Sequence, residues 1–127
     1  MGNRLLLALT FSVMFSSTSF ADWTKVGETK FGTTFYVDFE RIRKHGGHVY
    51  HWVMNDNLEP DKLGNLSSKA YHQADCKLFR YRYLSVLAHK EPMGKGTSRS
   101  YDLHDSQWRY PPPKSMAETI LNEVCSR

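Results

Sequence analysis

Cys76 and Cys125, the only two cysteines among the 127 residues, are the side chains best suited to form a covalent bond. Thiols can hold a metal ion, exchange with another disulfide or pair with each other. The chain has no Cys-x-x-Cys motif and no third cysteine, which disfavours a redox or metal site. We therefore predict a Cys76–Cys125 disulfide, which on the chain-entropy model stabilises the fold by about 4 kcal/mol through a loop of about 50 residues.

Three histidines, His45, His48 and His51, are spaced by three residues and are the next candidates for metal ligands. A strand places two ligands on one face at i and i+2, and a helix at i and i+4, so this spacing fits neither arrangement. No nearby acidic or cysteine side chain completes a tetrahedral set. We interpret the three as surface or half-buried polar residues, and we expect neither a metal ion nor a cofactor.

The segment Phe79–Tyr83 alternates aromatic and basic residues, a pattern that can stack bases and hold phosphates on a sheet. Alternation along a strand, however, sends the aromatic rings and the arginines to opposite faces. We therefore expect no nucleic-acid partner.

The chain offers no combination of residues typical of catalysis. It contains neither a Gly-x-Ser-x-Gly elbow nor a Gly-rich phosphate loop, and its cysteines are assigned to the disulfide. Asp38 and Glu40 are close in sequence, but a helix cap and a solvated neighbour explain them equally well. We predict that the protein is not an enzyme and has no catalytic residues.

Residues 1–21 have the order of an export signal. Arg4 is their only charged residue, an apolar run follows from Leu5 to Phe15, and Ser19-Phe20-Ala21 supplies small residues at −3 and −1 of a cleavage site. The apolar run is shorter than the ~20 residues of a membrane span. We predict cleavage after Ala21 and a single domain over 22–127, with no transmembrane span, located in the periplasm, outside the cell or on its surface. No cysteine follows the predicted cleavage site, so we do not expect a lipoprotein.

The predicted mature chain is mildly basic. Without Arg4 it retains 16 of the 17 Lys and Arg residues against 13 Asp and Glu, a net charge of +3. Such a charge gives a weak attraction to anionic surfaces. The candidates for contacting an anionic partner are five basic residues: Arg41, Arg43, Lys44, Lys77 and Lys90.

The elements that would position these residues are short strands and one helix. Composition and alternation predict strands over 23–26, 34–37, 48–55, 66–74, 75–87 and 97–103, with turns over 43–47 and 91–96 and a helical turn capped by Asp38. Ser115 and Glu118 form a capping box. The helix that follows has one apolar stripe, formed by Ala117, Ile120, Leu121, Val124 and Cys125. This composition predicts an α+β fold.

The predicted strand Asp75–Leu87 is expected to lie centrally and to carry Cys76 on the helix side. Arg80 and Arg82 would share that face, whereas Phe79, Tyr81 and Tyr83 would point away from the helix. Three explanations of the aromatic face remain open: a β-bulge near Arg80 that reverses the faces, cover by Trp108, Tyr110 and the polyproline segment, or contact with a partner or ligand.

The ordered set of motifs resembles the surface-adhesin protein E family. The motifs are Phe35–Ile42, Val49–Val53, Ser67–Cys76, Gly94–Gly96 and Pro112–Cys125. The resemblance implies an antiparallel sheet of about six strands, with the C-terminal helix tethered to its concave face by the disulfide. It also implies a protein partner, possible homodimers and binding of host extracellular-matrix proteins. The named adhesin is a lipoprotein, and the chain departs from it in lacking the lipid-accepting cysteine.

Three functions remain as hypotheses. The first is an exported, non-enzymatic adhesin-like binding domain. The second is a periplasmic accessory protein of cell-envelope complexes that has no host ligand, which the missing lipid-accepting cysteine favours. The third, an enzyme of unrecognised type, is disfavoured because the sequence shows no nucleophile, metal set or cofactor loop.

Overall fold

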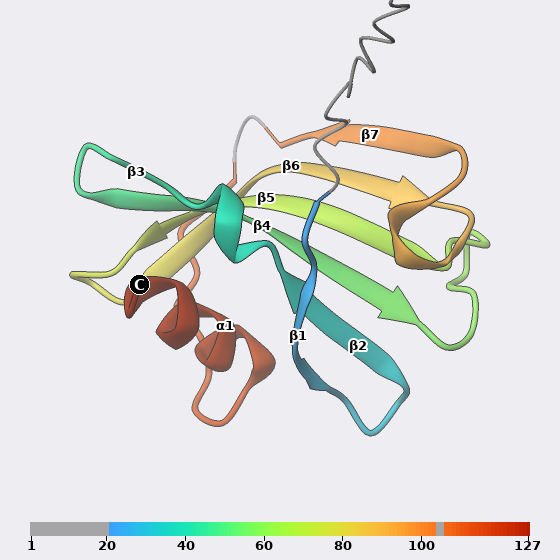
Figure 1. The fold of residues 1–127 in the computed structure, drawn as a ribbon, viewed down its shortest axis with the longest axis horizontal. Coiled ribbons are helices and arrows are strands. Elements are labelled where there is room, and N and C mark those ends of the chain that lie inside the picture. Colours follow the sequence, from blue (N-terminus) through green and yellow to red (C-terminus); the bar gives the residue numbers. More distant parts are fainter. Residues whose placement is uncertain (1–20, 104–105) are drawn as a thin grey trace, which may run out of the picture.

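The computed structural model describes residues 21–103 and 106–127. Apart from Ala21, the predicted signal peptide lies outside these residues. The described chain forms one antiparallel sheet with the α-helix α1 (Met116–Cys125) against one face (Figure 1). The strands are β1 (Thr24–Glu28), β2 (Thr33–Val37), β3 (Arg43–His45), β4 (His48–Asn57), β5 (Ser67–Asp75), β6 (Arg80–His89) and β7 (Ser98–Asp102). Two short 3-10 helices complete the fold, η1 (Phe39–Arg41) and η2 (Pro92–Gly94).

The strands follow the order β1-β2-β4-β5-β6-β7, and β3 pairs with the first residues of β4. The prediction of an α+β fold with an antiparallel sheet is confirmed. The sheet has seven strands because residues 43–45, predicted as part of a turn, form the short strand β3. Gly46 and Gly47 make the turn itself with φ of 58° and 79°, a left-handed conformation that glycine adopts without strain.

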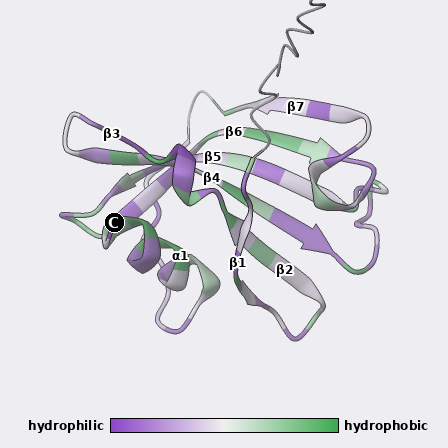
Figure 2. Ribbon diagram, in the orientation of Figure 1, coloured by the Kyte–Doolittle hydropathy of each residue, from purple (hydrophilic) through white to green (hydrophobic). Residues whose placement is uncertain are grey.

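The predicted apolar stripe of α1 and the Ser115 N-cap are confirmed, but Glu118 bonds to the backbone of Lys114 and not to that of Ser115, so the capping box is only half formed. Ser115 Oγ accepts a hydrogen bond from Glu118 N at 3.1 Å, and Glu118 Oε1 accepts one from Lys114 N at 3.3 Å. The buried residues of the helix are Ile120, Leu121 and Val124, and they form a core with Val37, Val49, Val53 and Ala74 of the sheet. Figure 2 shows both hydrophilic and hydrophobic residues on α1, as expected for a helix with one buried face.

The predicted disulfide is confirmed. It joins Cys76 to Cys125, the last residue of α1, with 5.6 Å between the two Cα atoms. The bond therefore ties the C-terminal end of the helix to the turn between β5 and β6.

The predicted strand Asp75–Leu87 is wrong in its first part, because residues 76–79 form a turn. Asp75 Oδ1 accepts a hydrogen bond from Leu78 N at 3.2 Å, and Phe79 has a φ of 53°. A carboxylate that bonds to the backbone a few residues ahead offers an alternative to the strand ladder. The aromatic and apolar residues of Phe79–Leu87, which favour a strand, concealed this turn signal.

The faces predicted for this segment are reversed in the structure. Residues paired across neighbouring strands share a face, and Arg80 pairs with Asp75 whereas Tyr81 pairs with the core residue Ala74. Tyr81 therefore lies on the helix side of the sheet, as does Tyr83, and Arg80 lies on the other side.

Two of the three explanations of the aromatic face are thereby corrected. The turn, rather than a bulge near Arg80, reverses the faces, and the register of β5 and β6 shifts further along, between Tyr71 and His72. Trp108 covers the arginines instead of the aromatic rings, with its ring 4.3 Å from the guanidinium carbon of Arg80 and 4.6 Å from that of Arg82.

The prediction that Asp38 caps a helical turn is wrong in its detail. The turn exists as η1, but the Asp38 side chain makes no cap hydrogen bond. It is fully buried, and Arg41 Nε lies 3.3 Å from its Oδ2. Burial of a carboxylate requires a cation nearby, so Asp38 and Arg41 act as a pair.

Candidate functional site

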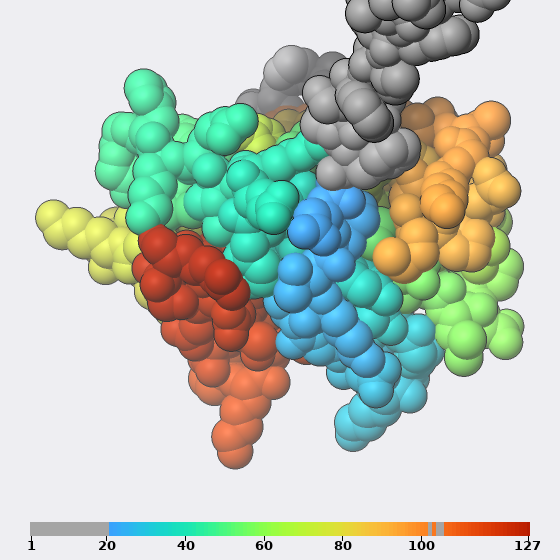
Figure 3. Space-filling model, in the orientation of Figure 1, coloured from blue at the N-terminus to red at the C-terminus, as the bar shows by residue number. Residues whose placement is uncertain are grey.

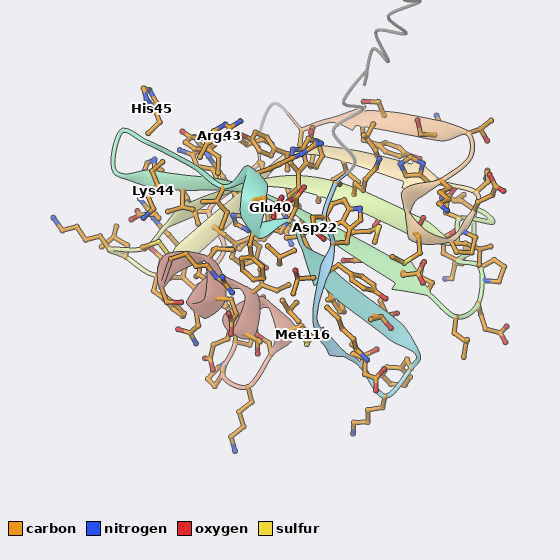
Figure 4. The ribbon with its side chains drawn as sticks, viewed as in Figure 1. Asp22, Glu40, Arg43, Lys44, His45 and Met116 are labelled. Atoms are coloured by element: carbon orange, nitrogen blue, oxygen red, sulfur yellow. A yellow bond between two sulfur atoms is a disulfide. The ribbon has the colours of Figure 1, made fainter. Side chains whose placement is uncertain are left out.

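The five basic residues predicted to contact a partner are not all brought together. Arg43 and Lys44 lie on β3 and Lys77 in the β5–β6 turn, at the end of the sheet where β4 and β6 begin (Figures 1 and 4). Arg41 adjoins this end on η1. Lys90 follows β6 and therefore lies at the opposite end of the sheet, where its Nζ donates a hydrogen bond to the Leu63 carbonyl.

Arg127 joins the first four residues, although the sequence analysis did not propose it. Its guanidinium carbon lies 3.8 Å from the Phe39 ring of η1, and its Nη2 lies 3.7 Å from Glu123 Oε2. Lys44 Nζ donates a hydrogen bond to the Arg127 carbonyl. We call the set Arg41, Arg43, Lys44, Lys77 and Arg127 the basic end.

Arg43 and Lys77 differ from the other members of the basic end. Both side chains are exposed, and within residues 21–103 and 106–127 neither takes part in a hydrogen bond or an ion pair, whereas the others bond to a carbonyl or a carboxylate. Figure 3 shows that the β3–β4 hairpin and the β5–β6 turn, which carry them, project from the body of the protein beside α1. These two cations are therefore available to an external anion.

Covalent and backbone restraints hold the basic end in place. The Cys76–Cys125 disulfide lies next to Lys77, and the Lys44–Arg127 hydrogen bond links the hairpin to the residues after α1. Between these restraints the surface has a shallow depression lined by residues of both segments: Lys44, His45, Gly46, Gly47, His48, Val49, Cys76 and Cys125. Segments held in this way lose little backbone conformational entropy on binding.

The arginines of β6 are engaged within the protein. Arg80 Nε donates a hydrogen bond to Asp75 Oδ2 at 2.9 Å, and this bond lowers the pKa of the Asp75 carboxyl below its usual value. Arg82 Nε donates to Gln73 Oε1 at 2.7 Å. With Trp108 packed on both guanidinium groups, these cations are not free to bind a partner.

The family model of surface-adhesin protein E matches residues 23–126, which is nearly all of the described chain. The chain belongs to the surface-adhesin protein E family. Membership agrees with the antiparallel sheet and with the helix that a disulfide ties to it. Membership of this family implies an exported or surface protein, so the chain is an adhesin-like domain.

Solved structures of Haemophilus influenzae protein E share the fold. One is 12% identical, with 82% of this chain and 83% of that chain covered and a TM-score of 0.61. Protein E from non-typeable Haemophilus influenzae is 11% identical, with 87% and 79% covered and a TM-score of 0.60. At this identity the likeness concerns the fold alone. No curated protein matches the chain.

Within the described part of the chain, no helix is long and apolar enough to cross a membrane.

Proposed function

We propose that this adhesin E domain is displayed at the cell surface, where it binds a host extracellular-matrix protein through the basic end. The observation that carries the proposal is the pair of exposed cations without an ion-pair partner, Arg43 and Lys77, on two neighbouring projections of the fold. A chain of the surface-adhesin family with such a feature is suited to an acidic protein surface.

Exposed cations contribute to binding chiefly by attracting the partner and orienting it. Charged groups at the rim of an interface raise the association rate, and salt weakens their effect. The basic end therefore predicts a salt-sensitive interaction. Lys90 lies at the other end of the sheet and is not part of the proposed contact.

The test compares two variants that change the net charge equally. One carries Arg43→Glu and Lys77→Glu at the basic end, and the control carries Lys62→Glu and Lys95→Glu in exposed loops at the opposite end. Binding of each purified domain to a solubilised basement-membrane matrix is measured on a biosensor at two salt concentrations. Since each exposed ion pair contributes about 0.2–1 kcal/mol, the loss of two should weaken binding of the basic-end variant by about two- to thirtyfold.

The control should bind within about twofold of the unaltered domain, because its charges lie away from the proposed contact. Melting temperatures of both variants establish that they are folded. Equal binding by the two variants would show that the basic end is not the contact surface.

The second candidate function is that of a periplasmic accessory protein of cell-envelope complexes. The specific observation in its favour is that no cysteine follows the predicted signal cleavage site, so the sequence provides no lipid attachment there. Chemical cross-linking in the periplasm followed by purification should then recover envelope proteins with the domain. Recovery of the domain alone would count against this function.

A further inference from the structure

A cavity of about 260 Å³ lies between the sheet and the first half of α1. Met116, Ala117 and Ile120 of the helix line one side of it, and β2, β4, β5 and β6 line the other. It lies on the helix side of the sheet, away from the exposed side chains of the basic end. The core of the domain is therefore incompletely filled beside the N-terminal half of α1.

The register of the strands gives the sheet side of the cavity a polar end, an apolar middle and a second polar end. His51 pairs with His72, Val53 with Ala70, and Asn55 with Ser68. Strand β6 adds Tyr83 opposite His72 and Val86 opposite Ala70. Because alternate residues along a strand are about 6.6 Å apart, the distance from the histidines to Asn55 and Ser68 is about 13 Å.

The two histidines at the inner end lack the hydrogen bonds that buried polar groups normally make. His51 is 1% exposed and His72 is 6% exposed. Within the described chain, Nε2 of His72 has no partner, and the only interaction of the His51 ring nitrogens is a weak one with the backbone of Val49. The rings lie edge to face, with centroids 5.1 Å apart. Buried polar atoms in native proteins are nearly always paired, so these nitrogens indicate a missing partner.

Both imidazoles are neutral at neutral pH. Desolvation by burial lowers the pKa of His51 to about 4 and lowers that of His72 well below its ordinary value. A neutral imidazole offers one N–H donor and one acceptor nitrogen. No charged side chain is among the described residues that line the cavity, so an ionised ligand would have no counter-charge there.

Water molecules alone do not match this cavity. A buried water needs two to four polar partners, and the middle of the cavity, formed by Val53, Ala70 and Val86, offers none. A molecule with an apolar body and one uncharged polar group matches the apolar middle and the histidine end, and the half-buried Asn55 and Ser68 at the other end can bond to solvent water.

We infer that the cavity binds a small, uncharged amphipathic molecule whose hydroxyl group hydrogen-bonds to His51 and His72 and whose apolar body lies along Val53, Ala70 and Val86. A hydroxyl can donate to one imidazole and accept from another. A cavity of about 260 Å³ accommodates two fused rings or an alcohol of eight to ten carbon atoms.

The probe for this site is 2-naphthol, compared with naphthalene and with naphthalene-2-carboxylate. Each is titrated into the folded domain and followed by NMR chemical shifts and probe fluorescence. Saturable binding of 2-naphthol is expected, with naphthalene two- to tenfold weaker because it lacks the hydroxyl group, and the carboxylate weaker still at neutral pH. Absence of saturable 2-naphthol binding, or equal affinity for 2-naphthol and naphthalene, would overturn the inference.

Two variants locate the binding site. Ala70→Leu fills the middle of the cavity and should abolish binding of both 2-naphthol and naphthalene. His51→Phe with His72→Phe keeps the rings but removes the nitrogens, so it should abolish the preference for 2-naphthol. Unchanged binding in Ala70→Leu, or an unchanged preference in the double variant, would contradict the inference. The comparison of the three probes uses the unaltered domain and so tests the inference even if a variant does not fold.

Discussion

Acid is expected to destabilise the domain between pH 6.5 and pH 4, because His51 is buried in its neutral form. Burial lowers its pKa from 6.5 to about 4, whereas the unfolded chain binds the proton near pH 6.5. The stabilisation is therefore fully present above pH 6.5 and is lost as the pH falls toward 4. His72 and His89, whose pKa values burial also lowers, change stability in the same direction.

The expected magnitude follows from the two pKa values of His51. Proton linkage with values of 6.5 and about 4 gives a loss of about 2 kcal/mol between pH 7 and pH 5, and about 3 kcal/mol below pH 4. The carboxyls of Asp61 and Asp75 have pKa values lowered from 3.8, so their contribution is lost at lower pH. The pH range in which the histidines destabilise the domain therefore lies above the range in which the acidic residues do.

The assay is urea unfolding of the domain at pH 7, 6 and 5, with the His51→Phe variant as the control. The variant should lose about 2 kcal/mol less than the unaltered domain over this range, because Phe cannot bind a proton. An unfolding free energy that is the same at pH 7 and pH 5 would refute the reasoning. So would an equal decrease in the variant, because the decrease would then come from other groups.

Three further predictions concern α1 and its attachment to the sheet. Cys125→Ser should leave the domain folded but lower its unfolding free energy by about 4 kcal/mol, because the disulfide closes a long loop. An unchanged melting temperature, either in this variant or in the original domain after chemical reduction of the disulfide, would contradict this role. Ser115→Ala removes the N-cap and should lower the unfolding free energy by about 1 kcal/mol in urea titrations, and a loss below a few tenths would mean that the cap is redundant. Leu121→Ala should cost about 2–5 kcal/mol because Leu121 is 1% exposed in the core. Exposed Asn122→Ala is its matched control and should cost less than about 0.5 kcal/mol; equal losses in the two variants would exclude the packing explanation.

The sequence predicted the helix and the disulfide correctly because the helix depends on neighbouring residues and the disulfide on the number of cysteines. Ser115 and Glu118 define the start of α1 within four residues, and two cysteines permit one pairing. The turn at residues 76–79 was missed because its signal is a single carboxylate, Asp75, followed closely by a segment rich in strand-forming residues, Phe79–Leu87. This single error reversed the faces of the tyrosines and arginines on β6.

The candidate sites depend on contacts between distant parts of the chain, which residue types alone do not specify. Arg43 and Lys77 are both recognisable as basic, but only the strand pairing places β3 and the β5–β6 turn at the same end of the sheet. His51 meets His72 through the β4–β5 register, and a shift of one residue would send His72 to the other face. The spacing of the histidines along the chain gave no sign of this pair.

Display of the domain at the cell surface is tested most directly by protease accessibility on intact cells that produce the chain. Trypsin is added to intact cells and to cells whose outer membrane has been opened, and the domain is followed with an antibody. Lys62 and Lys95 lie in exposed loops and provide cleavage sites. Digestion on intact cells is the predicted result. Protection on intact cells, with digestion once the outer membrane is opened, would contradict the adhesin function and favour a periplasmic partner.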